Sequence, residues 1–600
     1  MFPNKFQHSA ALLAAGAMLI GGLWIGSWTL VQSTVVQSTR PQSNLDSPAT
    51  AAPQPTWPHQ ETTPKSTATL ALPDADATDA PSPVHLMIGV EAAVPTSLHI
   101  WLQDAWTDEP PPVMIDANDA RATLRINTDP ANGVLLYRHF FAAATRFDTA
   151  NPAITWAQIQ QMWQNAAPSN DAQPTDSPFA QTAILSDTLP ALTQLLGAPG
   201  ANVQLAASVE ELRLRSRSEI STLLLLPFDQ LEPRLAVLAI DGQNPVENAH
   251  YFDPAHYPLV VDYYLHGPAH DADAQRHLAQ FTKELPPIPT SNRDPARLTV
   301  ITVTGVTALT RMTAHQMDQF GNDWPARIIG ADLAAADITH VSNEVSFVPG
   351  CQTDIAPDNL LFCSKPEYMA TLTASGVDII SLTGNHQNDF GLPAALTSLE
   401  LQSAAGFRLF GGGKNMAEAT APLFMEHNGN RLAFLGGNSF GPIQAWATAD
   451  APGAAPLDLD ALTASIRTIR QTEPASVIFV DVQNEERYEI SPMPGQRANF
   501  NAISLAGADV VTGVQAHSPQ ALEFTEGRLI LFGLGNLYFD QMWSEPTRQG
   551  IVAKHTIYAN RHISTQLLVT IIEDYGQPRW ATPAEREQIL TPLFRASYWE

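Results

Sequence analysis

The stretch VDIISLTGNHQNDFG, from Val377 to Gly391, decides the fold of the second half of the chain. Its first part is a run of β-branched and apolar residues, which is typical of a strand buried on both faces. Gly384 permits a sharp exit from that strand. Ligands bind beyond the carboxyl ends of strands in open α/β sheets. Four polar residues are expected just beyond this end of the strand: Asn385, His386, Asn388 and Asp389. A histidine and an aspartate beside an amide suit a metal site, a proton relay, or an acyl- or phosphoryl-transfer site.

The same design recurs between Leu298 and Asp540. Strand-like runs alternate with helix-like segments such as Pro393 to Ala405 and Leu459 to Gln471. This alternation predicts a layered α/β domain with a largely parallel sheet. The residues that follow the strand-like runs are Val306, Glu344, Asn438, Gln483, Gln515, His517 and Asn536. Because parallel strands end at the same sheet edge, we expect a single site built from many loops.

Six blocks in this region resemble the CapA capsule-synthesis family of the poly-γ-glutamate type, whose domain is similar to calcineurin-type metallophosphoesterases. In chain order, the blocks are GVTALTR from Gly305, SNE from Ser342, LTGNHQNDFG from Leu382, VQNEERYE from Val482, GADVVTGVQAHSPQALE from Gly507 and LGNLYFDQ from Leu534. The resemblance implies a four-layer metallophosphoesterase-like α/β sandwich over residues 298–600, in which strand-like segments after Gln541 are antiparallel additions to a mixed sheet. It also implies a role in capsule, poly-γ-glutamate or related cell-surface polymer synthesis.

Three positions depart from the pattern of that family. Its Gly-Asp block reads Gly305-Val306 here, its His-Trp-Gly block begins with Gln483, and its Gly-His-His-Pro-His block keeps only the last histidine, His517. Valine cannot ligate a metal, and a glutamine carbonyl is a poor substitute for imidazole. A full dinuclear site is therefore not expected. Two alternatives stay open: one divalent metal, or a metal-free acid–base site. The predicted metal ligands are Glu344, Asn385, His386 and His517, and the predicted catalytic residues are Glu344, His386 and His517.

Each of these residues also has a purely structural interpretation. In this interpretation His386 caps the following helix, and Glu344 pairs with Arg311 in the interior. His517 is then a structural histidine without a role in chemistry. Asp389 is expected either to support the site or to cap the helix that starts near Gly391. The remaining residues predicted to support the site or bind substrate are Asn388, Gln483, Gln515 and Asn536.

The N-terminus predicts a membrane anchor followed by a linker. The chain is uncharged from Ser9 to Val31, long enough to cross a bilayer, and Lys5 favours a cytoplasmic N-terminus. We interpret this segment as an uncleaved anchor, with a cleaved signal peptide as the alternative. Residues 32–83 are rich in Pro, Thr, Ser, Ala and Gln, a composition typical of an extended linker. The globular part is therefore expected outside the cytoplasm.

The two cysteines of the chain, Cys351 and Cys363, lie in one predicted loop after Glu344. A cysteine pair behind a membrane segment predicts a disulfide. A two-cysteine metal site is the alternative, although no neighbouring histidine completes it.

The net charge of −28 excludes nucleic acid as an expected partner, because the phosphate backbone would be repelled. The expected partners are a cell-surface polymer or its synthesis machinery, and the membrane through the N-terminal helix. An acidic protein needs cations or a local basic patch to hold a polyanion.

Residues 84–285 are predicted to form a separate α/β domain. The segments from Ser221 to Pro245 and from Tyr257 to Gly267 loosely resemble periplasmic solute-binding domains of the phosphate-binding type. That resemblance implies a cleft near Phe147-Asp148 and Pro227-Phe228-Asp229. An α/β spacer or a partner-binding domain is the alternative.

The predicted organisation is a cytoplasmic tail (1–8), a transmembrane anchor (9–31), a linker (32–83), a solute-binding-like α/β domain (84–285), a linker (286–297) and a metallophosphoesterase-like α/β sandwich (298–600). Two functional hypotheses follow. In the first, a membrane-anchored extracytoplasmic hydrolase or transferase acts at a phosphoester or amide in surface-polymer synthesis. In the second, the domain is catalytically degenerate and binds a polymer or a partner.

Overall fold

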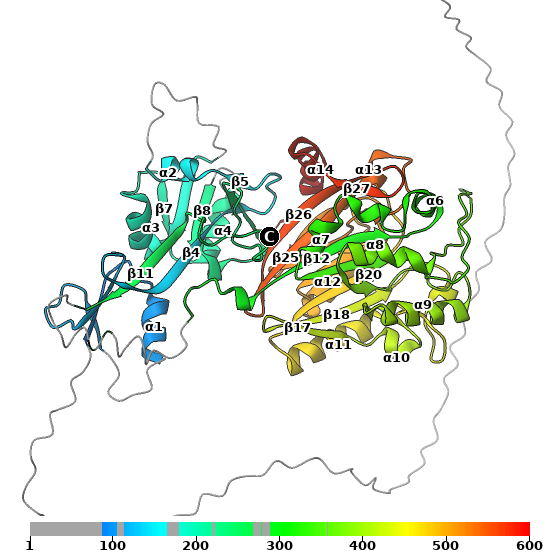
Figure 1. Cartoon of the computed structure of the whole chain (residues 1–600), viewed down its shortest axis with the longest axis horizontal. Helices are drawn as coiled ribbons and strands as arrows, with labels where there is room; N and C mark the ends of the chain where they lie inside the picture. Colours follow the sequence, from blue (N-terminus) through cyan, green and yellow to red (C-terminus); the bar gives the residue numbers. More distant parts are fainter. Residues whose placement is uncertain are drawn as a thin grey trace, which may run out of the picture. The chain divides into compact units, whose positions relative to one another are not determined.

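The strands and helices of the protein form a mixed α/β architecture with several sheets (Figure 1). This computed structural model describes residues 87–104, 113–164, 179–218, 222–267, 276, 278, 289–356 and 358–599. All of them belong to one compact unit, Pro81–Glu600. The predicted tail, anchor and linker (residues 1–83) all lie outside the described residues. Within the described ranges, no helix is both long and apolar enough to cross a membrane.

A nine-stranded sheet organises the first part of this unit. Its order is β2-β1-β3-β11-β4-β8-β6-β7, and β9 pairs with β4. The strands are β1 (Met87–Val90), β2 (Val113–Asp116), β3 (Leu124–Asn127), β4 (Val134–Arg146), β6 (Gln181–Leu185), β7 (Val203–Ala206), β8 (Thr222–Pro227), β9 (Leu235–Val237) and β11 (Val260–His266). The sequence of β8, TLLLLP, is buried along its whole length, as expected for a central strand covered on both faces.

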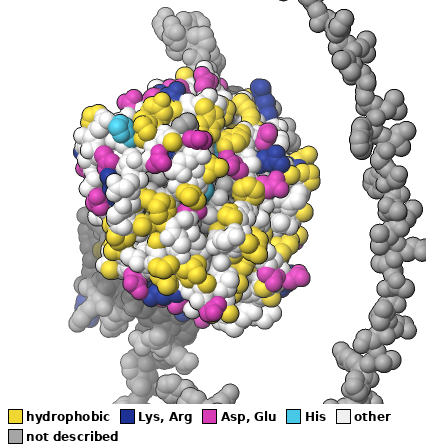
Figure 2. All heavy atoms as spheres, turned by 90° about the vertical axis from the view of Figure 1, so that its right-hand side faces the viewer, with side chains coloured by type: hydrophobic (Ala, Val, Ile, Leu, Met, Phe, Trp, Pro, Cys, Tyr) yellow, Lys and Arg dark blue, Asp and Glu magenta, His cyan; other side chains and the backbone are white. Residues whose placement is uncertain are grey.

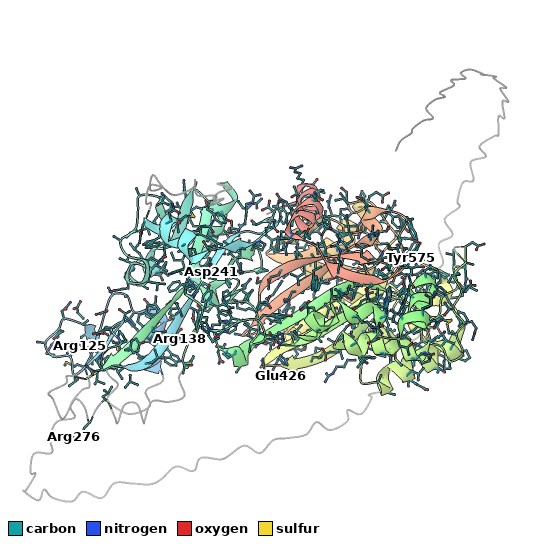
Figure 3. All side chains as sticks on the ribbon, turned by 45° about the horizontal axis from the view of Figure 1, so that its top comes forward. Arg125, Arg138, Asp241, Arg276, Glu426 and Tyr575 are labelled. Atoms are coloured by element: carbon teal, nitrogen blue, oxygen red, sulfur yellow. A yellow bond between two sulfur atoms is a disulfide. The ribbon has the colours of Figure 1, made fainter. Side chains whose placement is uncertain are left out.

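The helices of this part are α1 (Thr96–Asp104), α2 (Trp156–Gln164), α3 (Leu189–Leu196) and α4 (Val209–Ser218). A short parallel pair, β5 (Ala153–Ile154) with β10 (Ala239–Ile240), lies apart from the main sheet. Figure 3 labels Arg125 on β3 and Arg138 on β4. Arg138 pairs across to Asp262 on β11 at 2.9 Å, which ties these two antiparallel strands together.

The C-terminal part contains two larger sheets. The first has the order β15-β14-β13-β12-β25-β26-β27, with β24 beside β12. Strands β12 to β15 are parallel, whereas β25, β26 and β27 are antiparallel additions. Their bounds are β12 (Leu298–Thr307), β13 (Ile338–Asn343), β14 (Val377–Ser381), β15 (Arg408–Phe410), β24 (Asn536–Tyr538), β25 (Gln549–Tyr558), β26 (Arg561–Glu573) and β27 (Gln577–Trp580).

The second large sheet has the order β17-β18-β20-β21-β23-β22. Its four inner strands are parallel, and its two edge strands are antiparallel. The bounds are β17 (Leu423–His427), β18 (Asn430–Asn438), β20 (Val477–Gln483), β21 (Val510–Gly513), β22 (Leu522–Thr525) and β23 (Arg528–Leu531). A two-stranded pair, β16 (Gly412–Gly413) with β19 (Gly453–Ala454), stands apart.

The two large sheets pack face to face. One buried cluster contains Val303 and Ile379 from the first sheet together with Phe434 and Phe479 from the second. Separate clusters lie beneath the helices that cover the outer faces (Figure 1). The covering helices are α6 (Arg311–Phe320), α7 (Gly330–Ala334), α8 (Met369–Ala374) and α9 (Leu392–Ala404) on the first sheet, and α11 (Leu459–Thr472) and α12 (Pro494–Ala506) on the second.

The expected α/β sandwich is therefore present, with helices on both outer sides. The prediction of one largely parallel sheet was wrong, because the strands divide between two mixed sheets. The remaining helices are α10 (Met416–Ala419), α13 (Glu545–Arg548) and α14 (Pro583–Ala596). Helix α14 begins with a capping box in which Thr582 and Glu585 satisfy each other's backbone N–H groups.

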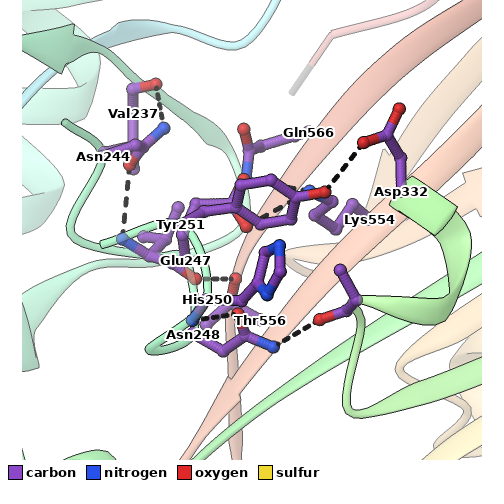
Figure 4. Close-up of polar contacts among 12 residues, drawn as sticks. Val237, Asn244, Glu247, Asn248, His250, Tyr251, Asp332, Lys554, Thr556 and Gln566 are labelled. Carbon is purple, nitrogen blue, oxygen red and sulfur yellow. Dashed lines mark hydrogen bonds and ion pairs between the residues drawn. The ribbon is translucent and has the colours of Figure 1, made fainter. Parts of the chain in front are cut away.

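A polar cluster joins the segment before β11 to the C-terminal sandwich (Figure 4). The Lys554 ammonium donates to both Glu247 carboxylate oxygens at 3.1 and 3.2 Å, and Gln566 donates to the same carboxylate at 2.9 Å. Asn248 donates to the Ala335 carbonyl at 2.8 Å. The Lys554 and Glu247 side chains are only 9% and 11% exposed, so this ion pair is nearly buried.

The predicted linker 286–297 is structured where it is described. The Asn292 side chain accepts a hydrogen bond from the Phe140 N–H at 2.8 Å and donates to the Phe140 carbonyl at 2.9 Å. Ser291 forms a bridge with Arg138 of β4. This segment therefore packs along β4.

Candidate functional site

The predicted site residues lie where strands of both large sheets end. Glu344 directly follows β13, and Gln483 is the last residue of β20. The loop after β14 carries Asn385 and His386, and His386 forms a backbone bridge with Val345. Gln515 and His517 follow β21. Because the inner strands of each sheet are parallel, their carboxyl ends share an edge, as the sequence predicted.

The loop after β14 passes very close to Glu344. A Cβ atom at Gly384 would lie 2.6 Å from the Glu344 Cα, so only glycine fits there. Glu344 is 3% exposed, and its Oε2 has no hydrogen-bond partner among the described residues. A buried carboxylate oxygen without a partner is costly, and such atoms concentrate at functional sites.

His386 and Asp389 form a partly buried pair within this loop. The His386 Nδ1 lies 2.6 Å from the Asp389 Oδ2, which also accepts the Phe362 N–H at 2.8 Å. Burial lowers the pKa of His386, but the hydrogen bond that it donates to Asp389 and the charges of Glu344, Asp389 and Glu486 outweigh burial and raise that pKa above its ordinary value.

The site therefore favours a protonated imidazole that is held by a carboxylate. Helix α9 is capped by Gly391 without a side-chain hydrogen bond, so the alternative capping roles of His386 and Asp389 were wrong.

An aromatic and ionic stack supports His386 from the disulfide loop. The Phe362 ring lies 4.3 Å from the His386 ring, centroid to centroid. The Arg311 guanidinium lies 5.1 Å from the Phe362 and Phe539 ring centroids and forms an ion pair with Asp540. The alternative in which Arg311 pairs with Glu344 was therefore wrong. Asp540 shapes this loop, as expected.

An amide contact joins the two sheets at the site. The Gln483 Nε2 donates to the Asn385 Oδ1 at 2.5 Å, and both side chains are buried. Val306, which stands at the aspartate position of the related family, packs in an apolar cluster with Val345 and Phe362. The oxygen that Asn385 would offer to a metal therefore already accepts a hydrogen bond, and its neighbour Gln483 presents a donor.

His517 is fixed by Asn536. Its Nδ1 lies 2.8 Å from the Asn536 Oδ1, and Asn536 also donates to the Thr547 carbonyl at 2.9 Å. Gln515 is 3% exposed, and its Oε1 has no hydrogen-bond partner in the described part of the chain. Asn388 has a structural role, because its side-chain amide donates hydrogen bonds to the Gln444 and Pro452 carbonyls and so holds the loop in place.

The predicted single-metal site does not fit this arrangement. No group of three or more His, Cys, Asp or Glu side chains placed to hold a metal occurs within the described ranges, so Glu344, His386 and His517 do not form a ligand cluster. The His386 Nδ1 is taken up by the Asp389 carboxylate at 2.6 Å, so only its Nε2 is left for another partner. Asn385 accepts from Gln483, as described above. We derive no step through a metal.

Two side chains near the site were missed by sequence reasoning. Phe362 was missed because it lies in the loop that carries Cys363, where the sequence has no strand or helix pattern that would place a side chain at the site. Tyr488 lies in the NEERYE block and stacks on His517 with ring centroids 6.2 Å apart. Burial and a hydrogen bond to Glu486 raise the pKa of Tyr488. The charged residues around it, Glu485, Glu486, Arg487 and Glu489, were interpreted as a family motif or as a solvated face with a local ion pair, and Arg487 does pair with Glu485 at 3.1 Å.

The predicted disulfide between Cys351 and Cys363 is present, with Cα atoms 6.0 Å apart. It closes the loop that carries Phe362. The alternative of a two-cysteine metal site was therefore wrong. The disulfide fixes the segment that packs on His386.

The part of the chain that forms the two-sheet sandwich and its polar edge matches a known family model. Residues 300–541 match the model of the family described as "Bacterial capsule synthesis protein PGA_cap". The predicted CapA resemblance is confirmed over these residues.

Named relatives agree with this family. The chain is 25% identical over 271 residues to the capsule biosynthesis protein CapA of Bacillus anthracis, covering 44% of this chain and 66% of the relative. It is 25% identical over 193 residues to the PGA biosynthesis protein CapA of Bacillus subtilis (strain 168), covering 32% and 50%. The matches thus span about half to two thirds of the length of these relatives.

Solved structures with similar parts are distant. An ABC-type phosphate transport receptor from Vibrio cholerae is 9% identical, with a TM-score of 0.27, over 33% of this chain and 93% of that one. A putative 5'-nucleotidase from Staphylococcus aureus is 12% identical, with a TM-score of 0.30, over 49% and 58%. Because these TM-scores are low, the description of the fold rests on the sheet topology given above and not on these structures.

Proposed function

We propose that this protein acts outside the cytoplasm, anchored in the membrane, in the synthesis of a capsule, poly-γ-glutamate or a related cell-surface polymer. The family match over residues 300–541 and the names of the Bacillus relatives support this role. The apolar segment 9–31 supports the anchor. The Cys351–Cys363 disulfide supports an oxidising compartment.

Within that role, the edge site binds polymer without a metal. The single observation that carries this proposal is the 2.5 Å hydrogen bond from the Gln483 amide to the Asn385 oxygen. In the related family, the position of Gln483 holds a histidine. Glutamine places an N–H donor there, and that donor satisfies the oxygen which a metal would otherwise use.

The polarity of the site suits a chain of amides that carries carboxylates. Oxygens of Glu344 and Gln515 are buried acceptors without partners among the described residues, and an amide N–H of a ligand would satisfy them. His386, whose pKa is raised by its hydrogen bond to Asp389 and by the neighbouring carboxylates, is the cationic group of the site that a ligand carboxylate would meet.

Hydrolysis without a metal is the second candidate function. The observation that favours it is the Asp389–His386 pair beside the buried Glu344 carboxylate. In this arrangement Glu344 acts as the general base toward water, and the His386 imidazolium protonates the leaving group of an amide or phosphoester.

Binding of poly-γ-glutamate to the full-length protein, measured by calorimetry, tests the proposal. We expect wild-type protein to bind without releasing fragments, and Glu344→Gln and His386→Gln to bind at least tenfold more weakly. Glu473→Gln is the matched control, because Glu473 is a surface residue paired with Arg431. Fragment release that disappears in Glu344→Gln would instead assign hydrolysis. Unchanged binding in both site variants would reject the polymer site.

A reconstruction of the family pattern tests the metal-free account. The triple variant Val306→Asp, Gln483→His, Gln515→His replaces the three departures at once. We expect it to gain manganese or zinc binding that the wild type lacks, measured by equilibrium dialysis. A folded triple variant that gains no metal would show that the three substitutions do not explain the altered site.

A further inference from the structure

A second cavity lies where α1, β4 and the turn between β25 and β26 meet. Its volume is about 300 Å³. The residues that line it come from segments remote in sequence, and they include Trp101 on α1, Tyr137 on β4, and Tyr558 and Arg561 at the β25–β26 turn. None of the edge-site residues lines it. It therefore represents a separate site with its own chemistry.

Positive charge dominates the lining of this cavity. Arg297 and Arg561 both line it, and neither has a carboxylate partner among the described residues. The Arg297 guanidinium lies 5.5 Å from the Tyr558 ring centroid. Arg561 donates to the Asp229 and Leu231 carbonyls at 2.8 and 2.9 Å, which orients it. Most arginines elsewhere in the described ranges pair with Asp or Glu, so two unpaired guanidinium groups in one hollow are unusual in a chain this acidic.

One carboxylate faces the same space. Asp229 lines the cavity, and its Oδ1 accepts the Asn292 amide at 2.9 Å. The pocket therefore combines two guanidinium groups with one carboxylate, for a net positive charge. The face of the protein drawn in Figure 2 carries acidic side chains scattered among hydrophobic ones. The local charge of the cavity thus opposes the overall charge of the chain.

Aromatic side chains form the walls. Tyr558 is fixed, because its hydroxyl donates to the Asn292 carbonyl at 2.8 Å and accepts the Asp294 N–H at 3.1 Å. The Trp101 indole and the Tyr137 hydroxyl make no hydrogen bond to any described residue, so their donors are available to a ligand. Flat aromatic walls with a few polar groups are typical of pockets for small organic molecules.

We propose that this cavity binds a small organic anion, a carboxylate or phosphate monoester with a planar or apolar body. Arg297 and Arg561 engage the anionic group, since guanidinium groups match the geometry of both oxyanions. Trp101 and Tyr137 contact the body of the molecule. A volume of about 300 Å³ exceeds what a bare inorganic anion fills and lies at the lower end of the range for small-molecule pockets. This inference goes beyond the proposed polymer role and does not depend on it.

Fluorine NMR of the full-length protein tests the proposal. The probes are 4-fluorobenzoate and 4-fluorophenyl phosphate, with the uncharged 4-fluorobenzamide as the matched control and inorganic phosphate as a competitor. We expect the fluorine signals of one or both anions to broaden on addition of protein, and that of the benzamide to stay sharp. Inorganic phosphate is expected to compete weakly. Equal broadening of the benzamide, displacement by phosphate at matching concentration, or no broadening of either anion up to millimolar concentration would each overturn the proposal.

Variants locate the binding. Arg297→Gln removes a guanidinium that makes only a ring contact, so the fold should tolerate it. It is expected to weaken the binding of the anions about tenfold, the equivalent of ~1.4 kcal/mol. Trp101→Leu should weaken binding similarly. Arg408→Gln is the control, because Arg408 is also an exposed arginine but lines a different hollow. Wild-type affinity in both Arg297→Gln and Trp101→Leu would place the anions elsewhere and refute the site.

Discussion

The contact between Gln483 and Asn385 makes a quantitative prediction. Gln483 is 1% exposed and Asn385 is 8% exposed, and their hydrogen bond joins the ends of β20 and the loop after β14. In Gln483→Leu the side-chain volume is nearly kept, but the Asn385 Oδ1 loses its donor. A buried acceptor without a partner costs about 1–3 kcal/mol, so we expect the free energy of unfolding to fall by about 2 kcal/mol.

A double-mutant cycle isolates this contact. Asn385→Leu alone leaves the Gln483 amide without its acceptor and should also cost about 2 kcal/mol. The double variant removes both partners, so its loss should be close to that of either single variant, a coupling of about 1–2 kcal/mol. Urea unfolding of the full-length protein followed by circular dichroism measures all four free energies. Gln402→Leu combined with Asn385→Leu is the control cycle, because Gln402 bonds to Ser398 and shares no partner with Asn385.

Additive losses in the Gln483 and Asn385 cycle would refute the reasoning. Additivity would mean that the two side chains do not satisfy each other in solution. The Asn385 oxygen would then be available to another group, including a metal. In the control cycle, additivity within about 0.5 kcal/mol is expected.

Three further predictions concern stability. Cys351→Ser opens the disulfide loop and should lower the free energy of unfolding by about 3 kcal/mol. The loss should match that of the reduced wild type, and an unfolding midpoint in urea above that of the reduced wild type would contradict this prediction. Lys554→Met leaves Glu247 charged and nearly buried, and should cost about 3 kcal/mol; adding Glu247→Leu should recover most of that loss, whereas additive losses would argue against the pair. Burial lowers the pKa of His139 to about 3. Between that pKa and about pH 6.5, the unfolded chain binds a proton at His139 and the folded protein does not. The free energy of unfolding therefore falls as the pH falls from 6.5 toward 3, by about 2 kcal/mol at pH 5. His139→Phe should remove this loss, and an equal pH dependence in the variant would contradict it.

Sequence reasoning found the strands of the sandwich because their burial is local information. The short runs rich in β-branched residues in β12, β14 and β20 favour strands, and β12 and β20 are buried along their whole length. The division into two sheets was not predictable, because it depends on how β24 and β25 return beside β12. Those pairings join residues more than 200 positions apart, and periodicity carries no signal for them.

The site was predicted in part. The edge location of Glu344, His386 and His517 followed from the parallel strand ends. The Gln483–Asn385 contact was not predictable, because it crosses from one sheet to the other. The Asp540–Arg311–Phe362 stack was also missed, since it requires the disulfide loop to fold back over the loop after β14.

The metal content of the full-length protein tests the central claim most directly. The protein would be produced with manganese, zinc and iron in the medium, purified without chelators and analysed by mass spectrometry, beside Glu344→Ala and His517→Ala. Our account predicts far less than one ion per chain, with the same low content in both variants. About one ion per folded chain, lost in both variants, would contradict a metal-free site and restore Glu344 and His517 as ligands.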